Sequence, residues 1–347
     1  MIIHSDFTGG NIRLLKVENE VVFLDNELRD TTEDWFYWAF CVEGAEGRTL
    51  SFRFKENRVG YFGPAISYDL KTWAWLGDTD GEGFTYTFKK GENKVYFAHD
   101  MLYLPERFSE FAEGKGLLLN TLCRSKKGRG VPYVKFGSGE KSIILTARHH
   151  ACEATGSYVL EGVLSYLLKN AIPDTTVFCV PFVDYDGVTD GDQGKSRFPH
   201  DHNRDYSTEK ASIYPETAAI IRYSEEHGCH FGFDFHSPWH KGGVNDKVFI
   251  VQNFKEKLPD LNSFALILEK NILPDAHPYS HENDFPPETE WNKAGPQFAC
   301  FMAKRPENRL AFTLETAYFG EKERPVTEKG LLLLGESFGA ALSKYVK

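Results

Sequence analysis

Three groups of polar residues end or follow apolar, strand-like segments of the chain, and their side chains are of the kinds that bind metals or transfer protons. His150 and Glu153 follow the segment KSIILTA, and His236 ends the segment HFGFDFH. A spacing of three residues allows a turn to bring the imidazole of His150 and the carboxylate of Glu153 to one cation. With His236 they make a His₂Glu set, which leaves zinc one open coordination position for water. The set therefore predicts a catalytic metal site rather than a structural one.

The third group contains Glu315, which follows the nearly all-apolar segment LAFTL. Partial burial would raise the pKa of this carboxylate and make it a general base. An exposed strand-end or helix-capping glutamate is the alternative interpretation. Between the first two groups lies the segment DHNRD (residues 201–205), which follows the Gly-rich stretch DYDGVTDGDQGKSR. On composition alone this segment is typical of a solvated loop.

Strand-like and helical segments alternate beyond about residue 102, and they must position these groups. Apolar runs predict strands at 141–147, 176–183, 230–236, 247–251 and 309–314, and helical periodicity predicts helices at 155–170, 215–227 and 327–345. Helices of this length are the usual crossovers between parallel strands. We therefore expect an α/β domain with a mixed, largely parallel sheet flanked by helices. Ligands bind at the carboxyl ends of the strands in such sheets, where the three groups fall.

The first part of the chain has a different pattern. Short, aromatic-rich segments with period-two alternation are separated by turn residues from residue 1 to about 110. This pattern predicts an N-terminal antiparallel β-sandwich over residues 1–110 and a catalytic domain over residues 111–347. The sandwich is expected to carry no catalytic group and to narrow the mouth of the site sterically.

Charge and hydropathy exclude two classes of partner. Fifty acidic and 40 basic residues give a formal charge of −10, so the phosphate backbone of a nucleic acid would be repelled. We find no apolar stretch of the length that spans a bilayer and no signal-peptide pattern at the N-terminus. The sequence therefore predicts a cytoplasmic protein with no nucleic-acid or membrane partner, and it predicts no oligomeric state.

The order of the motifs resembles one family. TARHHACEA is similar to the ARxHPGE motif of the M14-type zinc carboxypeptidases, PFVDYDGV to their PxxNPDGV, and DHNRDY to their DxNRxW. DFHS resembles DLHxH, and FTLETAY resembles FTLE followed by Ser or Thr. The opening SDFTGGNI resembles the SxFxxGN motif of the cytosolic carboxypeptidase-like branch, which has an N-terminal β-sandwich. Six motifs in the same order cover nearly the whole chain.

The resemblance implies the roles of the residues around the metal. Zinc (Zn²⁺) would be bound by His150, Glu153 and His236, and Glu315 would be the general acid/base. Asp201 would orient the first histidine ligand through its remote ring nitrogen, which fixes the tautomer. Zinc would lower the pKa of its bound water and polarise the scissile carbonyl.

The resemblance also implies how the substrate is held. Arg204, supported by Asn203, would bind the C-terminal carboxylate of a peptide, because a guanidinium matches a carboxylate bidentately. The family needs a further cation to stabilise the oxyanion. Arg197 and Lys195 lie in the corresponding loop, and Arg197 is preferred for its planar fork. Arg148, adjacent to the metal ligands, stays an alternative.

The motifs depart from the family in two places. Ala151 and Cys152 replace the usual Pro-Gly, and His149 is an additional neighbouring histidine. The spacing to Glu153 assigns the ligand role to His150 and predicts that His149 points elsewhere. DFHSPWH lacks the histidine that usually follows two places after the ligand, and the role of His240 stays open.

These features predict a zinc-dependent metallocarboxypeptidase that acts on peptides with a free C-terminal carboxylate. An amidohydrolase or deacylase of N-acyl amino acids is the second candidate, because the same groups hydrolyse any amide. A non-catalytic peptide- or carbohydrate-binding protein on a peptidase scaffold is the third. The segment 298–305 is expected to contribute to specificity, and Lys304 or Arg305 would pair with an acidic terminal side chain unless both lie in a solvated turn.

Overall fold

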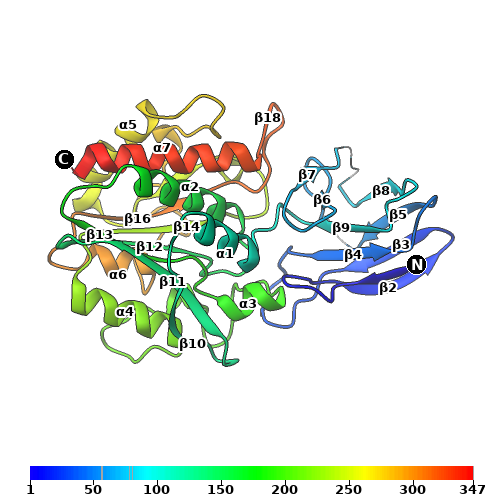
Figure 1. Cartoon of the computed structure of the whole chain (residues 1–347), viewed down its shortest axis with the longest axis horizontal. Coiled ribbons are helices and arrows are strands. Elements are labelled where there is room, and N and C mark those ends of the chain that lie inside the picture. Colours follow the sequence, from blue (N-terminus) through cyan, green and yellow to red (C-terminus); the bar gives the residue numbers. More distant parts are fainter. Residues whose placement is uncertain (56–57, 78, 80, 347) are drawn as a thin grey trace.

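The structure is a computed structural model that describes residues 1–55, 58–77, 79 and 81–346. Two β-sheets packed face to face form the N-terminal lobe, at the right of Figure 1. One sheet has the order β1 (Ile2–His4), β4 (Ala39–Glu43), β9 (Lys94–Ala98), β6 (Ala65–Ser67) and β7 (Ala74–Trp75). The other has the order β2 (Arg13–Glu18), β3 (Val21–Asp25), β5 (Thr49–Phe54) and β8 (Gly83–Thr87).

The strand pairs of this lobe are antiparallel, as expected, except for β3 and β5. β4 lies between these two in the chain and belongs to the opposite sheet, so the chain returns to the second sheet in its original direction. Aromatic residues fill the space between the sheets. The rings of Phe52 and Phe84 are 4.8 Å apart, and Phe40 and Phe97 from the first sheet lie 5.4 Å from each other. These alternating aromatic positions explain the period-two pattern of the sequence.

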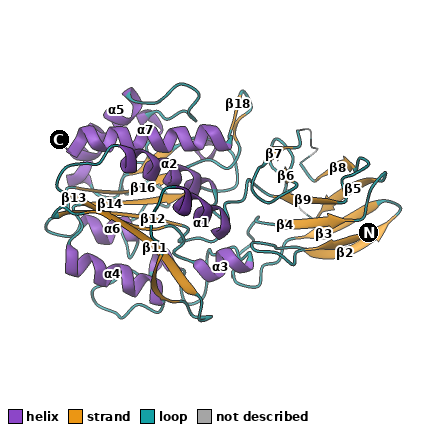
Figure 2. Cartoon of the chain, in the orientation of Figure 1, coloured by secondary structure: helices purple, strands orange, loops and turns teal. Residues whose placement is uncertain are grey.

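The larger lobe contains a mixed sheet. Seven described strands follow the order β10 (Asn120–Arg124), β11 (Gly130–Gly137), β13 (Thr175–Val180), β12 (Lys141–Ala147), β14 (Phe231–His236), β16 (Leu310–Glu315) and β15 (Phe249–Val251). The four strands β13, β12, β14 and β16 are parallel to one another, and β10, β11 and β15 join antiparallel at the edges (Figure 2). The expected fold class is confirmed.

Helices cover both faces of this sheet, as Figures 1 and 2 show. One face carries α1 (Pro105–Gly114), α2 (Thr155–Lys169), α5 (Leu258–Lys270) and α7 (Glu328–Val346), and the other carries α4 (Pro215–His227) and α6 (Phe298–Ala303). The short α3 (Tyr185–Asp190) lies toward the N-terminal lobe. The remaining regular elements are the hairpin β17 (Gly320–Glu321) and β18 (Arg324–Pro325) and the 3-10 helices η1 (His202–Arg204), η2 (Gly243–Asp246), η3 (Lys255–Lys257) and η4 (His281–Asn283).

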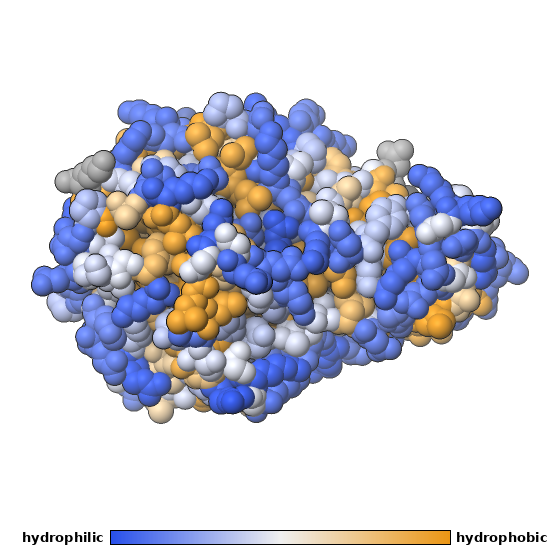
Figure 3. Space-filling view, in the orientation of Figure 1, coloured by the Kyte–Doolittle hydropathy of each residue, from blue (hydrophilic) through white to orange (hydrophobic). Residues whose placement is uncertain are grey.

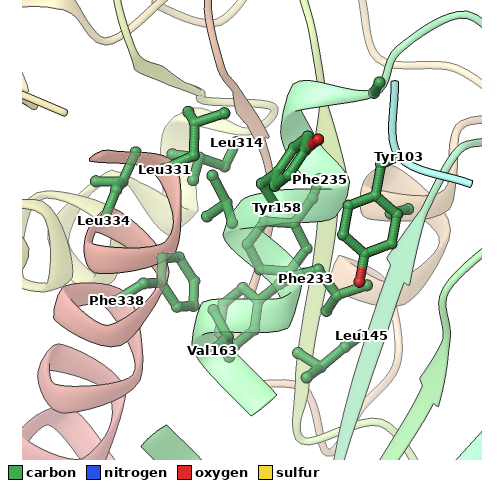
Figure 4. Packing of buried hydrophobic residues seen from close by; sticks show 14 of the residues in the cluster. Tyr103, Leu145, Tyr158, Val163, Phe233, Phe235, Leu314, Leu331, Leu334 and Phe338 are labelled. Atoms are coloured by element: carbon green, nitrogen blue, oxygen red, sulfur yellow. The ribbon is translucent and has the colours of Figure 1, made fainter. Parts of the chain in front are cut away.

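The parallel strands are buried on both faces. Within β12, Leu145 packs into the cluster under α2 and α7, whereas Ile144 packs into the cluster under α4 and α6. Successive side chains of a strand alternate between faces, so both positions must be apolar. Figure 4 shows Leu145 and Phe233 against Val163 and Phe338 of the covering helices. This double burial is the physical origin of the near-continuous apolar runs in the sequence.

The predicted domain boundary at residue 110 falls within α1, after the last strand of the N-terminal lobe has ended at Ala98. The division at that residue stays a prediction. The two lobes share one continuous apolar cluster, which includes Phe36 from the first and Phe182 from the second. No helix among the described residues is both long enough and apolar enough to cross a membrane. The face drawn in Figure 3 is mostly hydrophilic, with smaller hydrophobic areas over the larger lobe.

Candidate metal and substrate site

Three neighbouring parallel strands end at the same edge of the sheet and position the residues of the candidate site there. β12 leads to His150 and Glu153, β14 ends at His236, and β16 ends at Glu315. The register pairs His236 with Glu315, so these two side chains lie beside each other on adjacent strands. Arg148, the first residue after β12, has a φ of 61°, which turns the chain away from the strand direction. The sheet thus brings the three groups together.

His150, Glu153 and His236 converge in space. Nδ1 of His150 lies 2.8 Å from Oε1 of Glu153, and Nδ1 of His236 lies 2.6 Å from Oε2 of the same carboxylate. The two Nδ1 atoms are 3.1 Å apart. One ligand atom from each residue lies within 4.8 Å of the others, and all three residues are buried. Two imidazole nitrogens and one carboxylate around a common point fit a metal cation.

His149 has different neighbours. Its Nδ1 lies 2.8 Å from Oδ1 of Asp234, and its Nε2 lies 2.7 Å from the hydroxyl of Tyr206. With Asp234 and His236 it forms a second group that could hold a cation. Both of its ring nitrogens are engaged, however, and only His150 and His236 line the cavity described below. The geometry therefore favours His150 over His149 as a ligand.

Carboxylates face the remote nitrogens of both candidate histidine ligands. Asp201 Oδ1 lies 3.7 Å from Nε2 of His150, and Asp234 Oδ2 lies 2.6 Å from Nε2 of His236. Burial of Asp201 disfavours its charged form, but His150 and then Arg204 outweigh this effect and hold its pKa below the ordinary value. Such carboxylates fix the tautomer and orientation of a ligating histidine. The sequence analysis missed Asp234, although it stands two residues before His236 on the same side of β14.

Glu315 lies beside the ligands within the same cavity. The residue is 8 % exposed, and its Oε2 has no hydrogen-bond partner among the described residues. Burial raises the pKa of this carboxyl group to about 7; Glu153 adds to the increase, while His236 and Lys195 oppose it. A carboxylate with these surroundings is suited to exchange protons near neutral pH.

Lys195 and Arg204 supply positive charge to the cavity. Nζ of Lys195 lies 3.1 Å from Oε1 of Glu153 and 5.6 Å from the ring of Trp35. Arg204 lines the cavity and donates a hydrogen bond from Nη1 to the carbonyl of Asn203. The Oδ1 of Asn203 accepts a hydrogen bond from the backbone N–H that begins α6. Both Asn203 and Arg204 therefore lie in the same cavity as the predicted ligands His150 and His236.

Arg197 is not placed at the cavity. Its guanidinium forms ion pairs with Asp30, Asp184 and Asp192 at 3.0, 2.7 and 3.1 Å. Arg148 is also committed elsewhere, because it donates to backbone carbonyl oxygens on both sides of its turn. The expectation that Arg197 stabilises an oxyanion is therefore corrected: among the described residues, the cation of this loop that lines the cavity is Lys195. The cause is nonlocal, since Asp30 belongs to the N-terminal lobe.

The N-terminal lobe holds the loop that carries Lys195. The carboxylate of Asp30 accepts hydrogen bonds from the backbone N–H groups of Gln193 at 3.0 Å and Gly194 at 2.8 Å. The side-chain amide of Gln193 exchanges two hydrogen bonds of 2.9 Å with the backbone of Tyr37. Gly194 has a φ of +75°, and a Cβ there would lie 2.0 Å from the backbone nitrogen of Ala151. We call this set of contacts the Asp30 clamp.

The cavity has a volume of about 260 Å³. Trp35 from the N-terminal lobe and Trp239 from the larger lobe line it with ring centroids 4.8 Å apart. Lys304 and Arg305, considered as partners for an acidic substrate side chain, instead line a separate depression. His240, whose role was open, lies 2.8 Å from His99 at the junction of the lobes.

Comparisons with known proteins find similar sequences and similar folds. Residues 3–99 match the cytosolic carboxypeptidase N-terminal domain. The chain is 25% identical to an uncharacterized Zymomonas mobilis protein, over 94% of this chain and 90% of that one. It is 28% identical to cytosolic carboxypeptidase 2 of Xenopus tropicalis, over 58% of this chain but only 24% of that longer protein.

Two solved structures share the whole fold. A metallo-carboxypeptidase from Burkholderia cenocepacia superimposes with a TM-score of 0.81 and 19% identity, over 99% of this chain and 98% of that one. A Pseudomonas aeruginosa metallo-carboxypeptidase gives a TM-score of 0.77 and 19% identity, over 100% and 99% of the two chains. The N-terminal domain, the sequence relatives and the fold agree. The fold is therefore that of the metallo-carboxypeptidases, and residues 3–99 resemble the N-terminal domain of the cytosolic carboxypeptidases.

Proposed function

We propose that the chain is a zinc-dependent metallocarboxypeptidase that hydrolyses the last peptide bond of substrates with a free C-terminal carboxylate. The observation that carries this proposal is the convergence of His150, Glu153 and His236 beside the buried carboxylate of Glu315, in a cavity that also contains Arg204. The donor set of two imidazoles and one carboxylate suits zinc, with one position left open. When bound there, zinc supplies Lewis acidity, which polarises a carbonyl and lowers the pKa of coordinated water.

The side chains of the cavity divide the work of the reaction. Arg204 binds the terminal carboxylate and so selects the end of a chain over internal peptide bonds. Lys195 stabilises negative charge on the scissile carbonyl oxygen. Glu315 accepts a proton from the attacking water and delivers it to the leaving amine. Asp201 and Asp234 hold the two histidines in position.

Peptide hydrolysis with and without a chelator tests the proposal. The enzyme would be offered one peptide as the free acid and as the C-terminal amide, beside an N-acyl amino acid, with products identified by mass spectrometry. We expect release of single C-terminal residues from the free acid, loss of this activity with chelator and recovery with zinc. Equal cleavage of the amide would contradict the role of Arg204. Cleavage of the N-acyl amino acid alone would replace the proposal with a deacylase.

The absence of stoichiometric metal in protein purified without chelator would favour the third candidate, a binding protein on a peptidase scaffold. We also propose a cytoplasmic location, which the names of the cytosolic carboxypeptidase relatives support. Cell fractionation tests this location.

A further inference from the structure

We infer that His149 and Tyr206 are positioning residues for the metal site, and that they act through Asp234 on the candidate ligand His236. The inference rests on the proposed function, because it takes His236 as a zinc ligand. It goes beyond that function, since neither His149 nor Tyr206 is among the described residues that line the cavity. We call Tyr206, His149, Asp234 and His236 together the His149 network.

Hydrogen bonds join the members of the His149 network one after another. The hydroxyl of Tyr206 lies 2.7 Å from Nε2 of His149, and Nδ1 of His149 lies 2.8 Å from Oδ1 of Asp234. The other oxygen of Asp234 lies 2.6 Å from Nε2 of His236. Each of the four residues is at most 2 % exposed, so water cannot readily replace a bond that is lost. The side chains must therefore satisfy one another.

Asp234 is the central acceptor of the network. Thr146, its register partner on β12, donates from Oγ1 to Oδ1 of Asp234 at 2.8 Å. His149 donates to the same oxygen, and His236 donates to the other. A buried carboxylate is stable in its charged form when such donors surround it. Without His149, Oδ1 would keep only Thr146 among the described residues, and the carboxylate could turn away from His236.

One arrangement of protons satisfies the whole network. The Tyr206 hydroxyl has no other hydrogen-bond partner among the described residues, so its proton is paired only if Nε2 of His149 accepts it. His149 then carries a proton on Nδ1 and donates it to Asp234. Asp234 also accepts the proton on Nε2 of His236, which leaves Nδ1 of that ring for the cation. This Nδ1 is the atom that faces Glu153, at 2.6 Å. The network thus selects the tautomer that a metal needs.

The segment before α6 holds the outer end of the network. The backbone N–H of Tyr206 donates to the carbonyl of Pro296 at 3.1 Å, and its ring lies edge-on to that of Phe298 at 5.6 Å. Tyr206 follows η1 closely, so one short segment presents Asn203 and Arg204 to the cavity and Tyr206 to the network. The position of the hydroxyl is therefore fixed by packing outside the metal site.

The other candidate histidine ligand lacks comparable support. Oδ1 of Asp201 lies 3.7 Å from Nε2 of His150, and neither atom has a hydrogen-bond partner among the described residues. His236 is therefore the more firmly held of the two rings. The effect of the network on zinc binding should accordingly depend on His236.

Zinc affinity tests the inference independently of turnover. It is measured at one pH by competition with a chromophoric chelator. We expect His149→Ala to bind one zinc about 10- to 100-fold more weakly than wild type, the usual effect of losing a group behind a ligand. Tyr206→Phe should show a smaller loss, and the double variant should lose no more than His149→Ala alone, because Tyr206 acts only through His149. His149→Asn should recover part of the affinity, since its amide can donate to Asp234.

Tyr158→Phe is the matched control. Tyr158 is fully buried on the other face of the sheet, and its hydroxyl donates to the carbonyl of Leu102 at 2.8 Å. This variant loses one buried hydrogen bond, as Tyr206→Phe does, but should bind zinc like wild type. Equal affinities in Tyr206→Phe and Tyr158→Phe would overturn the inference.

The remaining outcomes separate the inference from the proposed function. Complete loss of zinc in His149→Ala, as expected for His150→Ala, would make His149 a ligand and also overturn the inference. If the expected order of zinc affinities were found without any peptide hydrolysis, the proposed function would fail and the inference would stand. Wild type that bound no zinc would refute both.

Discussion

Replacing Lys195 with methionine separates the role of this side chain from that of Arg197. The substitution keeps most of the stem that lies near Trp35 and removes the charge that lies 3.1 Å from Glu153. Removing one oxyanion donor usually lowers kcat by about 10² to 10³, which corresponds to roughly 3 to 4 kcal/mol of transition-state stabilisation. We expect a loss of this size in Lys195→Met. Zinc binding should not weaken, because the cation that competes for the Glu153 carboxylate is gone.

Arg197→Met should fail in a different way. Its guanidinium is only 13% exposed and pairs with three carboxylates, Asp30, Asp184 and Asp192. Removal of one partner from a buried ion pair costs about 3 to 5 kcal/mol of folding free energy. A chain of 347 residues shifts its melting temperature by roughly 1.4 °C per kcal/mol, so this loss lowers the melting temperature by roughly 4 to 7 °C. The loss of stability should exceed any loss of kcat in the fraction that stays folded.

The assay for both variants is kcat at a temperature where each is folded, together with zinc content and thermal unfolding. Lys195→Arg is the control, since it keeps a cation and is expected to retain more activity than Lys195→Met. The reasoning would be refuted if Lys195→Met kept nearly full turnover while folded Arg197→Met lost 100-fold or more. Such a result would return the oxyanion role to Arg197.

Three further predictions concern proton transfer, metal binding and pH. Glu315→Gln should keep the fold and the zinc but lose about 10² to 10⁴ in kcat, the range for removal of a general acid/base; retention of turnover would exclude this role. His150→Ala should lose zinc as measured by metal analysis, whereas His149→Ala, which removes contacts to Asp234 and Tyr206, should keep more of it, and the reverse order would exchange the two assignments. Burial raises the pKa of Asp100 to about 8, and neither carboxylate oxygen has a hydrogen-bond partner among the described residues. Because the folded protein holds this proton to higher pH than the unfolded chain, the contribution to stability is complete below about pH 4 and is lost as pH rises toward 8. Urea unfolding should therefore show that wild type loses more stability than Asp100→Asn between pH 5 and pH 8, and equal losses would contradict the argument.

The parts of the fold that sequence predicts well are those buried on both faces. The strand at 141–147 coincides with β12, and the helix at 215–227 coincides with α4. Strands at the edges of the sheet have weaker sequence patterns. The edge strand β10 has the sequence NTLCR, which is partly exposed and neither apolar throughout nor regularly alternating. Its pairing with β11 depends on the sheet that forms around it, so local patterns did not predict the hairpin.

The candidate site divides in a similar way. Residues at strand ends, such as His236 and Glu315, could be predicted because parallel strands place their ends together. Asp234 was hidden within an apolar strand, where its partner His149 could not be foreseen. Whether Lys195 or Arg197 reaches the cavity depends on the path of the loop that carries both residues. The carboxylate of Asp30 holds this loop, and Asp30 is far from it in the sequence.

The Asp30 clamp changes what counts as a separable unit in this chain. The two sheets of the N-terminal lobe enclose an apolar core of their own, so this lobe alone resembles a domain that could be exchanged between relatives. The clamp couples this lobe to the proposed catalytic site, since the backbone that carries Lys195 is held by the carboxylate of Asp30 and the peptide group of Tyr37, which both belong to the N-terminal lobe. A chimera with a foreign N-terminal lobe would retain every metal ligand and still misplace its cation, unless the donor lobe presented an equivalent of Asp30. The loop at 193–197 and the segment at 30–37 together determine the position of Lys195, so selection for that position acts on both, although more than 150 residues separate them.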